Sequence, residues 1–203
     1  SYTQFVSGWK PLGKEMKVTR ATGNIVYELD GQPTYDAYYR YLKIKNDENF
    51  FFHTIEFPFY YIRNGVNILR DPVCCNEDGS IEMTSDVKEG ATGRLAYGDP
   101  MTILDSVAET RTEVASFSPE AILIFYCAGR RLFWGDDRIG RETQPFESLA
   151  PTFGFFTSSE FLRTNGYVNQ HNVTLVIAAM REGEPKENTT VDETLDNTER
   201  ISM

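Results

Sequence analysis

The apolar run from Ala121 to Tyr126 places the strongest constraint on how this chain can fold. Its consecutive apolar residues lack the alternation of a strand with one face in water, so they predict a central strand covered on both faces. A second apolar run, from Val173 to Ala179, predicts another strand near the end of the chain. The core is therefore expected to form around a sheet.

Local patterns predict the remaining elements. Asp99 and Pro100 mark a helix start, because Asp can cap free backbone N–H groups and Pro suits the first helical position; an apolar stripe then continues to about Phe117. A second helix is expected from Thr34, after Pro33. Further strands are predicted at Met16–Arg20, Asn24–Leu29, Glu56–Arg63, Val66–Cys75, Ser80–Thr84 and Arg94–Tyr97. This order predicts an α+β fold, with a mainly antiparallel sheet and two long helices packed on it.

Composition excludes several classes of partner. The chain has 203 residues and a formal net charge of −10, which argues against binding to a phosphate backbone. It contains no apolar stretch of the roughly 18 residues that a membrane span requires. Three cysteines without an even framework predict reduced thiols in the cytoplasm. We therefore expect neither nucleic acid nor a membrane as a partner.

Signatures of enzymes are scarce. The sequence contains no phosphate-binding Walker loop, no G-x-G-x-x-G, no H-E-x-x-H and no C-x-x-C. A nucleophilic pair of Cys127 and His171 would have to be brought together by folding alone, and no local pattern supports it. An enzyme is therefore the third-ranked hypothesis.

The segment after the central strand is a candidate binding site. The strand ends at Cys127, and Gly129 then allows a sharp turn and a close approach to a ligand. Arg130 and Arg131 follow, and a guanidinium is a planar fork suited to a carboxylate or phosphate. The alternative is a small core cysteine, an ordinary turn and two solvated arginines. Composition alone leaves both interpretations open.

A second candidate segment combines aromatic and small polar residues. Phe156 and Glu160 lie in the stretch 154–161, and His171 and Asn172 follow it. Such residues can line a pocket that is mostly apolar and has a few oriented hydrogen bonds. Alternatively, Glu160 caps a neighbouring backbone or pairs with one of the two arginines.

These segments together resemble the FIST family of sensory domains. The matching stretches, in order, are Cys127-Ala128-Gly129-Arg130-Arg131, Gly154-Phe155-Phe156 with Glu160, and His171-Asn172-Val173-Thr174. Upstream, Gly8-Trp9-Lys10-Pro11-Leu12-Gly13 and Val26-Tyr27-Glu28-Leu29-Asp30-Gly31 are similar to the end of the family's N-terminal module. One departure is Ser159, where the family usually has glycine.

The resemblance implies a domain division. Residues 1–30 would be the end of the FIST N-terminal module, and residues 31–180 the C-terminal module. Residues 181–203 carry seven acidic and three basic side chains, and would be an acidic linker toward an output domain covalently joined to this chain. The last residues look similar to junctions that precede diguanylate cyclase domains.

The resemblance also implies a function. It suggests a cytoplasmic bacterial module that senses a small ligand, such as an amino acid or a related metabolite. A ligand carboxylate would lie near Cys127, Gly129 and Arg130, with Glu160 facing an ammonium group and Asn172 completing the polar shell. The full expected ligand-binding set is Cys127, Gly129, Arg130, Arg131, Phe156, Glu160, His171 and Asn172.

Two alternatives accompany this reading. The main one is a protein–protein interaction module without a metabolite pocket. A minor one is haem binding, for which His53 and His171 are the only imidazoles. Otherwise no cofactor and no metal is expected.

Overall fold

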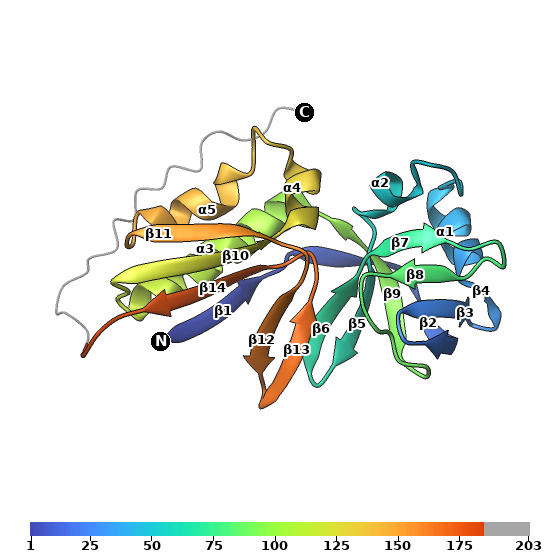
Figure 1. Cartoon of the computed structure of the whole chain (residues 1–203), viewed down its shortest axis with the longest axis horizontal. Coiled ribbons are helices and arrows are strands. Elements are labelled where there is room, and N and C mark those ends of the chain that lie inside the picture. The colour runs from blue at the N-terminus through green and yellow to red at the C-terminus, as the bar shows by residue number, and fades with distance from the viewer. Residues whose placement is uncertain (185–203) are drawn as a thin grey trace.

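The computed structural model describes residues 1–184 and consists of two lobes joined side by side (Figure 1). The first lobe is a four-stranded sheet with three helices, and the second is an eight-stranded sheet with two. A two-stranded hairpin, formed by β12 (Glu160–Thr164) and β13 (Tyr167–His171), lies where the lobes meet.

The four-stranded sheet joins the two ends of the described chain. Its order is β1 (Tyr2–Val6), β14 (Leu175–Met180), β10 (Ala121–Cys127) and β11 (Thr152–Thr157). β14 pairs antiparallel with both β1 and β10, whereas β10 and β11 are parallel. The apolar run that constrains the sequence is therefore an interior strand of this sheet, as predicted.

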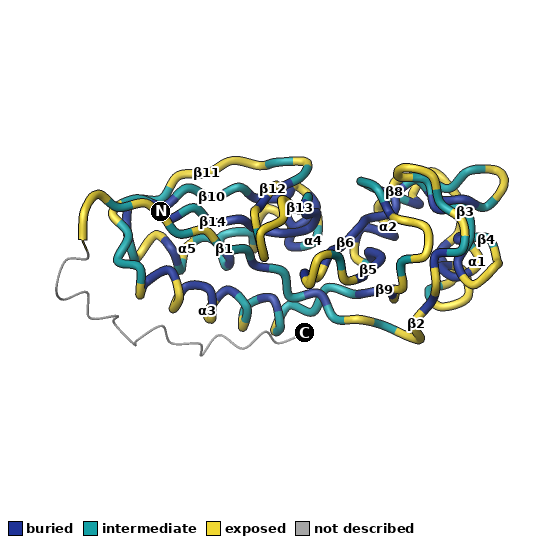
Figure 2. The backbone as a smooth tube through the Cα atoms, turned by 90° about the horizontal axis from the view of Figure 1, so that it is seen from below, coloured by how far each residue is buried: buried dark blue, intermediate teal, exposed yellow. Residues whose placement is uncertain are grey.

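Three helices belong to this lobe: α3 (Pro100–Ser116), α4 (Ala128–Trp134) and α5 (Gly140–Glu147). α3 begins at the predicted signal, because the Asp99 side chain accepts a hydrogen bond from the Met101 N–H at 3.1 Å. α3 and α5 lie on one side of the sheet (Figure 2). Buried residues of these two helices, including Val107, Val114 and Phe146, form a core with Ile122 and Ile124 of β10.

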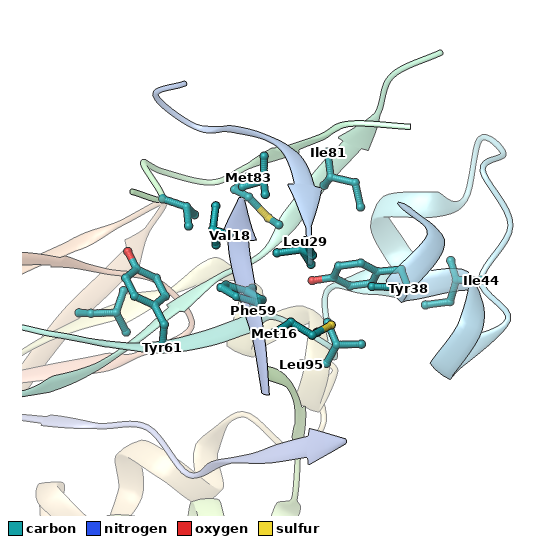
Figure 3. Packing of buried hydrophobic residues seen from close by; sticks show 14 of the residues in the cluster. Met16, Val18, Leu29, Tyr38, Ile44, Phe59, Tyr61, Ile81, Met83 and Leu95 are labelled. Atoms are coloured by element: carbon teal, nitrogen blue, oxygen red, sulfur yellow. The ribbon is translucent and has the colours of Figure 1, made fainter. Parts of the chain in front are cut away.

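The second lobe encloses its own apolar core. Its strands are β2 (Trp9–Thr22), β3 (Ile25–Leu29), β4 (Gln32–Pro33), β5 (Phe59–Arg63), β6 (Val66–Arg70), β7 (Pro72–Cys75), β8 (Ile81–Met83) and β9 (Thr92–Gly98). Its helices are α1 (Thr34–Leu42) and α2 (Phe50–Thr54). Tyr38 of α1 points into a cluster with Leu29, Phe59 and Leu95 (Figure 3). α1 therefore closes this core.

A third apolar cluster joins the lobes. Trp9, Leu69 and Ala96 of the second lobe pack with Ile103, Trp134 and Val173. Trp9 and Trp134 are each only 6% exposed. The contact between the lobes is thus an apolar core in its own right.

The α+β class and the mainly antiparallel pairing are confirmed. The described part has five helices, of which α3 is long and α1 has nine residues. The expectation that the central strand is covered on both faces is wrong, because buried residues alternate with half-buried ones along β10. None of the helices within residues 1–184 is long and apolar enough to span a bilayer. The predicted linker lies mostly outside the described residues.

Candidate functional site

Cys127 ends β10 inside the protein. Its Sγ accepts a hydrogen bond from the Val173 N–H at 3.2 Å. Burial, together with the nearby charges of Glu160 and Asp71, raises the pKa of the thiol to about 12. A catalytic thiol needs the opposite shift, so this cysteine has the properties of a core residue.

Gly129 lies in the first turn of α4, so the sharp turn predicted there is replaced by a helix. Its φ is not positive. A Cβ at this position would lie 3.5 Å from Cδ1 of Ile55, an ordinary van der Waals distance. The residue is buried, but its backbone does not require glycine.

Arg130 is fully buried and its guanidinium is occupied by the protein. Nε donates to Glu142 Oε2 at 3.0 Å, and Nη2 donates to Oε1 of the same carboxylate. Nη1 donates to the carbonyls of Val173 at 2.7 Å and Ser7 at 3.0 Å. The fork predicted to hold a ligand carboxylate thus holds an internal one, and it ties together β1, α5 and the segment before β14.

Arg131 and Phe156 lie on the surface. Arg131 Nε donates to Asp136 at 2.7 Å, and its guanidinium lies 5.1 Å from the centroid of the Phe156 ring. Phe156 is 49% exposed. These two side chains contact each other, but they do not face the buried residues of the predicted site.

Glu160 is 3% exposed at the start of β12. Its carboxylate accepts hydrogen bonds from the hydroxyls of Thr157 and Thr174, the latter at 2.8 Å. Burial raises its pKa to about 7, and these hydrogen bonds only partly oppose the shift. Glu160 therefore changes its charge near neutral pH.

His171 and Asn172 follow at the end of β13. The His171 ring lies 4.7 Å from the Phe5 ring, and neither of its nitrogens has a hydrogen-bond partner within residues 1–184. Burial lowers its pKa to about 4, so it is neutral at pH 7. Asn172 Nδ2 donates to Ser159 Oγ at 3.0 Å. Ser159, the departure from the family pattern, has no positive φ and supplies this acceptor.

Two residues of this region were missed by the sequence reasoning: Arg70, the last residue of β6, and Asp71, which links β6 to β7. Arg70 Nη1 donates to Asn172 Oδ1 at 3.1 Å, while Nη2 has no hydrogen-bond partner in the described chain and lies 3.8 Å from Asp86 Oδ1 in an ion pair. Asp71 is 2% exposed, and its Oδ1 also has no hydrogen-bond partner within residues 1–184. Burial raises the pKa of Asp71 to about 8. The signal was present: two charged residues interrupt the apolar pattern of the predicted strand Val66–Cys75.

Val173 shows how the predicted segments converge. It is fully buried with φ of +54°, a left-handed conformation that β-branched residues rarely adopt. Cys127 accepts from its N–H and Arg130 donates to its carbonyl. The structure therefore brings Cys127, Arg130, Glu160, His171 and Asn172 to the boundary between the lobes. Strain of this kind is often found at functional sites.

Other features do not add to this site. A surface pocket of about 30 Å³, enough for one water molecule, is lined by residues of β2, β4 and α1 and of the end of β3, and by none of the predicted site residues. Within residues 1–184 no three His, Cys, Asp or Glu side chains gather as metal ligands would. His53 is exposed on α2, whereas the His171 ring is buried against Phe5.

The chain thus has a two-lobed α+β fold with polar residues enclosed where the lobes meet. Two family models match it: the FIST C domain over residues 34–163 and the FIST N domain over residues 2–32. The first covers more than half of the chain, which therefore belongs to the FIST family. FIST domains are sensory modules of signal-transduction proteins rather than catalysts. No curated protein and no solved structure matches the chain.

Proposed function

We propose that this chain is the small-ligand-binding module of a bacterial signal-transduction protein, and that it senses an amino acid or a related metabolite in the cytoplasm. The observation that carries the proposal is the group of buried, unpartnered polar atoms at the lobe boundary. Within residues 1–184, both nitrogens of His171, Nη2 of Arg70 and Oδ1 of Asp71 lack a hydrogen bond. Leaving such groups unpaired costs about 1–3 kcal/mol each, so a polar ligand that pairs with them gains affinity.

An amino acid has the chemistry that these groups can recognise. Arg70 Nη2 makes no hydrogen bond within residues 1–184 and has only a loose ion pair with Asp86 Oδ1 at 3.8 Å, so it can still donate to a ligand carboxylate, whereas the fork of Arg130 is already filled by Glu142. The carboxyl groups of Asp71 and Glu160 can accept hydrogen bonds from an ammonium group, whose positive charge would favour their ionised forms. Neutral His171 can donate through one nitrogen and accept through the other. The proposal thus keeps Glu160, His171 and Asn172 in the predicted shell and adds Arg70 and Asp71.

The response would be a change in how the lobes pack. A ligand bound between Arg70 of one lobe and Glu160 near the other favours whichever arrangement it contacts best, and so shifts the equilibrium between arrangements. Val173 is strained between the lobes and is a natural position for such a change. A covalently linked output domain, such as a diguanylate cyclase, would receive the shift.

A thermal-shift screen of the chain against the standard amino acids tests this proposal, followed by calorimetric titration of any hit. We expect at least one amino acid to raise the melting temperature, because a ligand that binds only the folded state stabilises it. Arg70→Lys and Glu160→Gln should weaken the hit at least tenfold. Arg131→Lys, a change on the exposed surface, should leave the affinity unchanged. If no amino acid stabilises the chain, or if the two buried variants bind as well as the wild type, the ligand assignment fails.

An interaction module without a metabolite pocket is the second candidate. It is favoured by the exposed aromatic residues of β11, where Phe153 is 70% and Phe155 51% exposed. The ligand screen distinguishes the two candidates, because an interaction module predicts no stabilisation by any small molecule.

A further inference from the structure

The four-stranded sheet has two apolar faces, and residues 1–184 cover only one of them. α3 and α5 cover the face that carries Ile122, Ile124 and Tyr126. The opposite face, here called the open face, consists of the residues that alternate with these on each strand. No other element within residues 1–184 lies over it, apart from the β12–β13 hairpin at the end near Phe5 and Val176 (Figure 2).

The open face is continuous across three strands. In the strand register, Leu123 is paired with Phe153 and Ala178, and Phe125 with Phe155 and Val176. Phe125 and Phe155 contact each other edge to face, with ring centroids 5.3 Å apart. Toward the end of β14, Met180 is 41% exposed. The open face is therefore made up of Leu123, Phe125, Phe153, Phe155, Ala178 and Met180.

The strands of this sheet carry no charged side chains. None of its four strands contains an Asp, Glu, Lys or Arg, although the chain carries a net charge of −10. β11 is also an edge strand, yet it has none of the charges or prolines that usually protect exposed edges. A charged partner would find no oppositely charged side chain on this face. A second neutral, apolar sheet face could pack against it without local like-charge repulsion.

We infer that the open face is covered by the open face of a second copy of this chain. A two-fold axis places one surface against the same surface of the partner, so a neutral apolar patch is automatically complementary to itself in polarity. Two sheets would stack face to face about 10 Å apart, with Phe153 and Phe155 of each copy in the shared core. The resulting order of layers is helices, sheet, sheet, helices. This inference is independent of the ligand proposed above.

The size of the open face sets the expected strength of the dimer. Three strands about 4.8 Å apart, each about six residues long at about 3.3 Å per residue, give a flat area of roughly 300 Å² per copy, or roughly 600 Å² for both copies. This is below the roughly 1,200 Å² at which stable specific interfaces begin, so we expect a weak, transient dimer. The measurement therefore needs protein concentrations of up to about 100 μM.

Sedimentation equilibrium of the full chain tests the inference, with Phe153→Lys/Phe155→Lys as the variant. The wild type should approach twice the monomer mass as its concentration rises, whereas the variant should remain a monomer. Lysine is chosen because it makes the net charge less negative. General repulsion between copies then decreases, and a loss of the dimer reports the interface itself. Circular dichroism checks that the variant is folded.

Matched controls lie on exposed aromatic positions elsewhere. Phe52→Lys and Tyr39→Lys change side chains that are 61% and 48% exposed on the helices of the second lobe, outside the open face, and should leave the dimer intact. A wild-type chain that stays monomeric at the highest concentration overturns the inference and indicates a different occupant of the face. Dissociation by the control variants, or a dimer that survives in the Phe153/Phe155 variant, overturns it equally.

Discussion

Arg130 and Arg131 are neighbours of the same type with opposite environments. Arg130 is enclosed and bonded to Glu142 and to backbone carbonyls, whereas Arg131 pairs with Asp136 in solvent. A buried ion pair that loses one partner leaves an uncompensated charge in the interior. The sequence motif shows two equivalent basic residues, and only the fold distinguishes them.

Arg130→Met should therefore destabilise the chain by about 3–5 kcal/mol, because Glu142 is left buried without its partner. Arg131→Met should leave the stability nearly unchanged, because its ion pair with Asp136 is exposed to solvent. Urea denaturation measures both. The double variant Arg130→Met/Glu142→Met removes both charges and should recover part of the loss. Equal effects of the two single substitutions would contradict the structural role given to Arg130.

Glu160 should make the stability depend on pH. Its pKa is raised from 4.5 to about 7, so between these values the folded chain holds a proton that the unfolded chain releases. Its contribution to stability is therefore present at low pH and falls as pH rises through this window, by about 3 kcal/mol in total.

Glu160→Gln removes this dependence. Asp71 and His171 also titrate in this range, and as pH rises they change the free energy of unfolding in opposite directions. The informative quantity is therefore the difference in the free energy of unfolding between variant and wild type. Relative to wild type, the Gln variant should gain stability between pH 5 and about 8, as measured by denaturation at each pH. Glu147→Gln on the exposed side of α5 is the control and should follow the wild type. A constant difference between Gln variant and wild type across this range would show that Glu160 is not buried as described.

At the scale of elements, strong local sequence signals were sufficient to place a helix or strand. The Asp99–Pro100 start of α3 and the apolar runs of β10 and β14 were placed within a few residues. The short helices α2, α4 and α5 were missed because they lack capping side chains that hydrogen-bond to their first turns. α5 also contains Pro145, which normally signals the end of a helix.

The candidate site was only partly predictable from the sequence. Cys127, Arg130, Glu160 and Asn172 were found because each stands beside a glycine, an aromatic or a strand end. Their partners were not, because Glu142 lies on a different helix from Arg130, and Arg70 and Asp71 lie far upstream in the chain. The tertiary packing decides which oxygen atoms accept hydrogen bonds from a guanidinium group. A local sequence pattern therefore cannot predict them.

At the scale of the molecule, the lobes should unfold together. Both tryptophans lie in the apolar cluster between them, so tryptophan fluorescence reports the junction while far-ultraviolet circular dichroism reports all secondary structure. We expect the two signals to give the same urea midpoint, as in a two-state transition. Val173→Ala should lower both midpoints together, since it opens a cavity in this cluster. An earlier fluorescence transition would mean that the lobes separate before they unfold.

The pairing of β1 with β14 also affects how the chain folds as it leaves the ribosome. The second lobe is encoded between residues 9 and 98, so all its strands are available before β14 is made. β1 precedes them, but its hydrogen-bonding neighbour begins only at Leu175. β1 must therefore wait without this partner while the whole second lobe is synthesised. Closure of the four-stranded sheet is thus expected to follow folding of the second lobe, and a nascent chain stopped before residue 175 should remain open to proteases around β1.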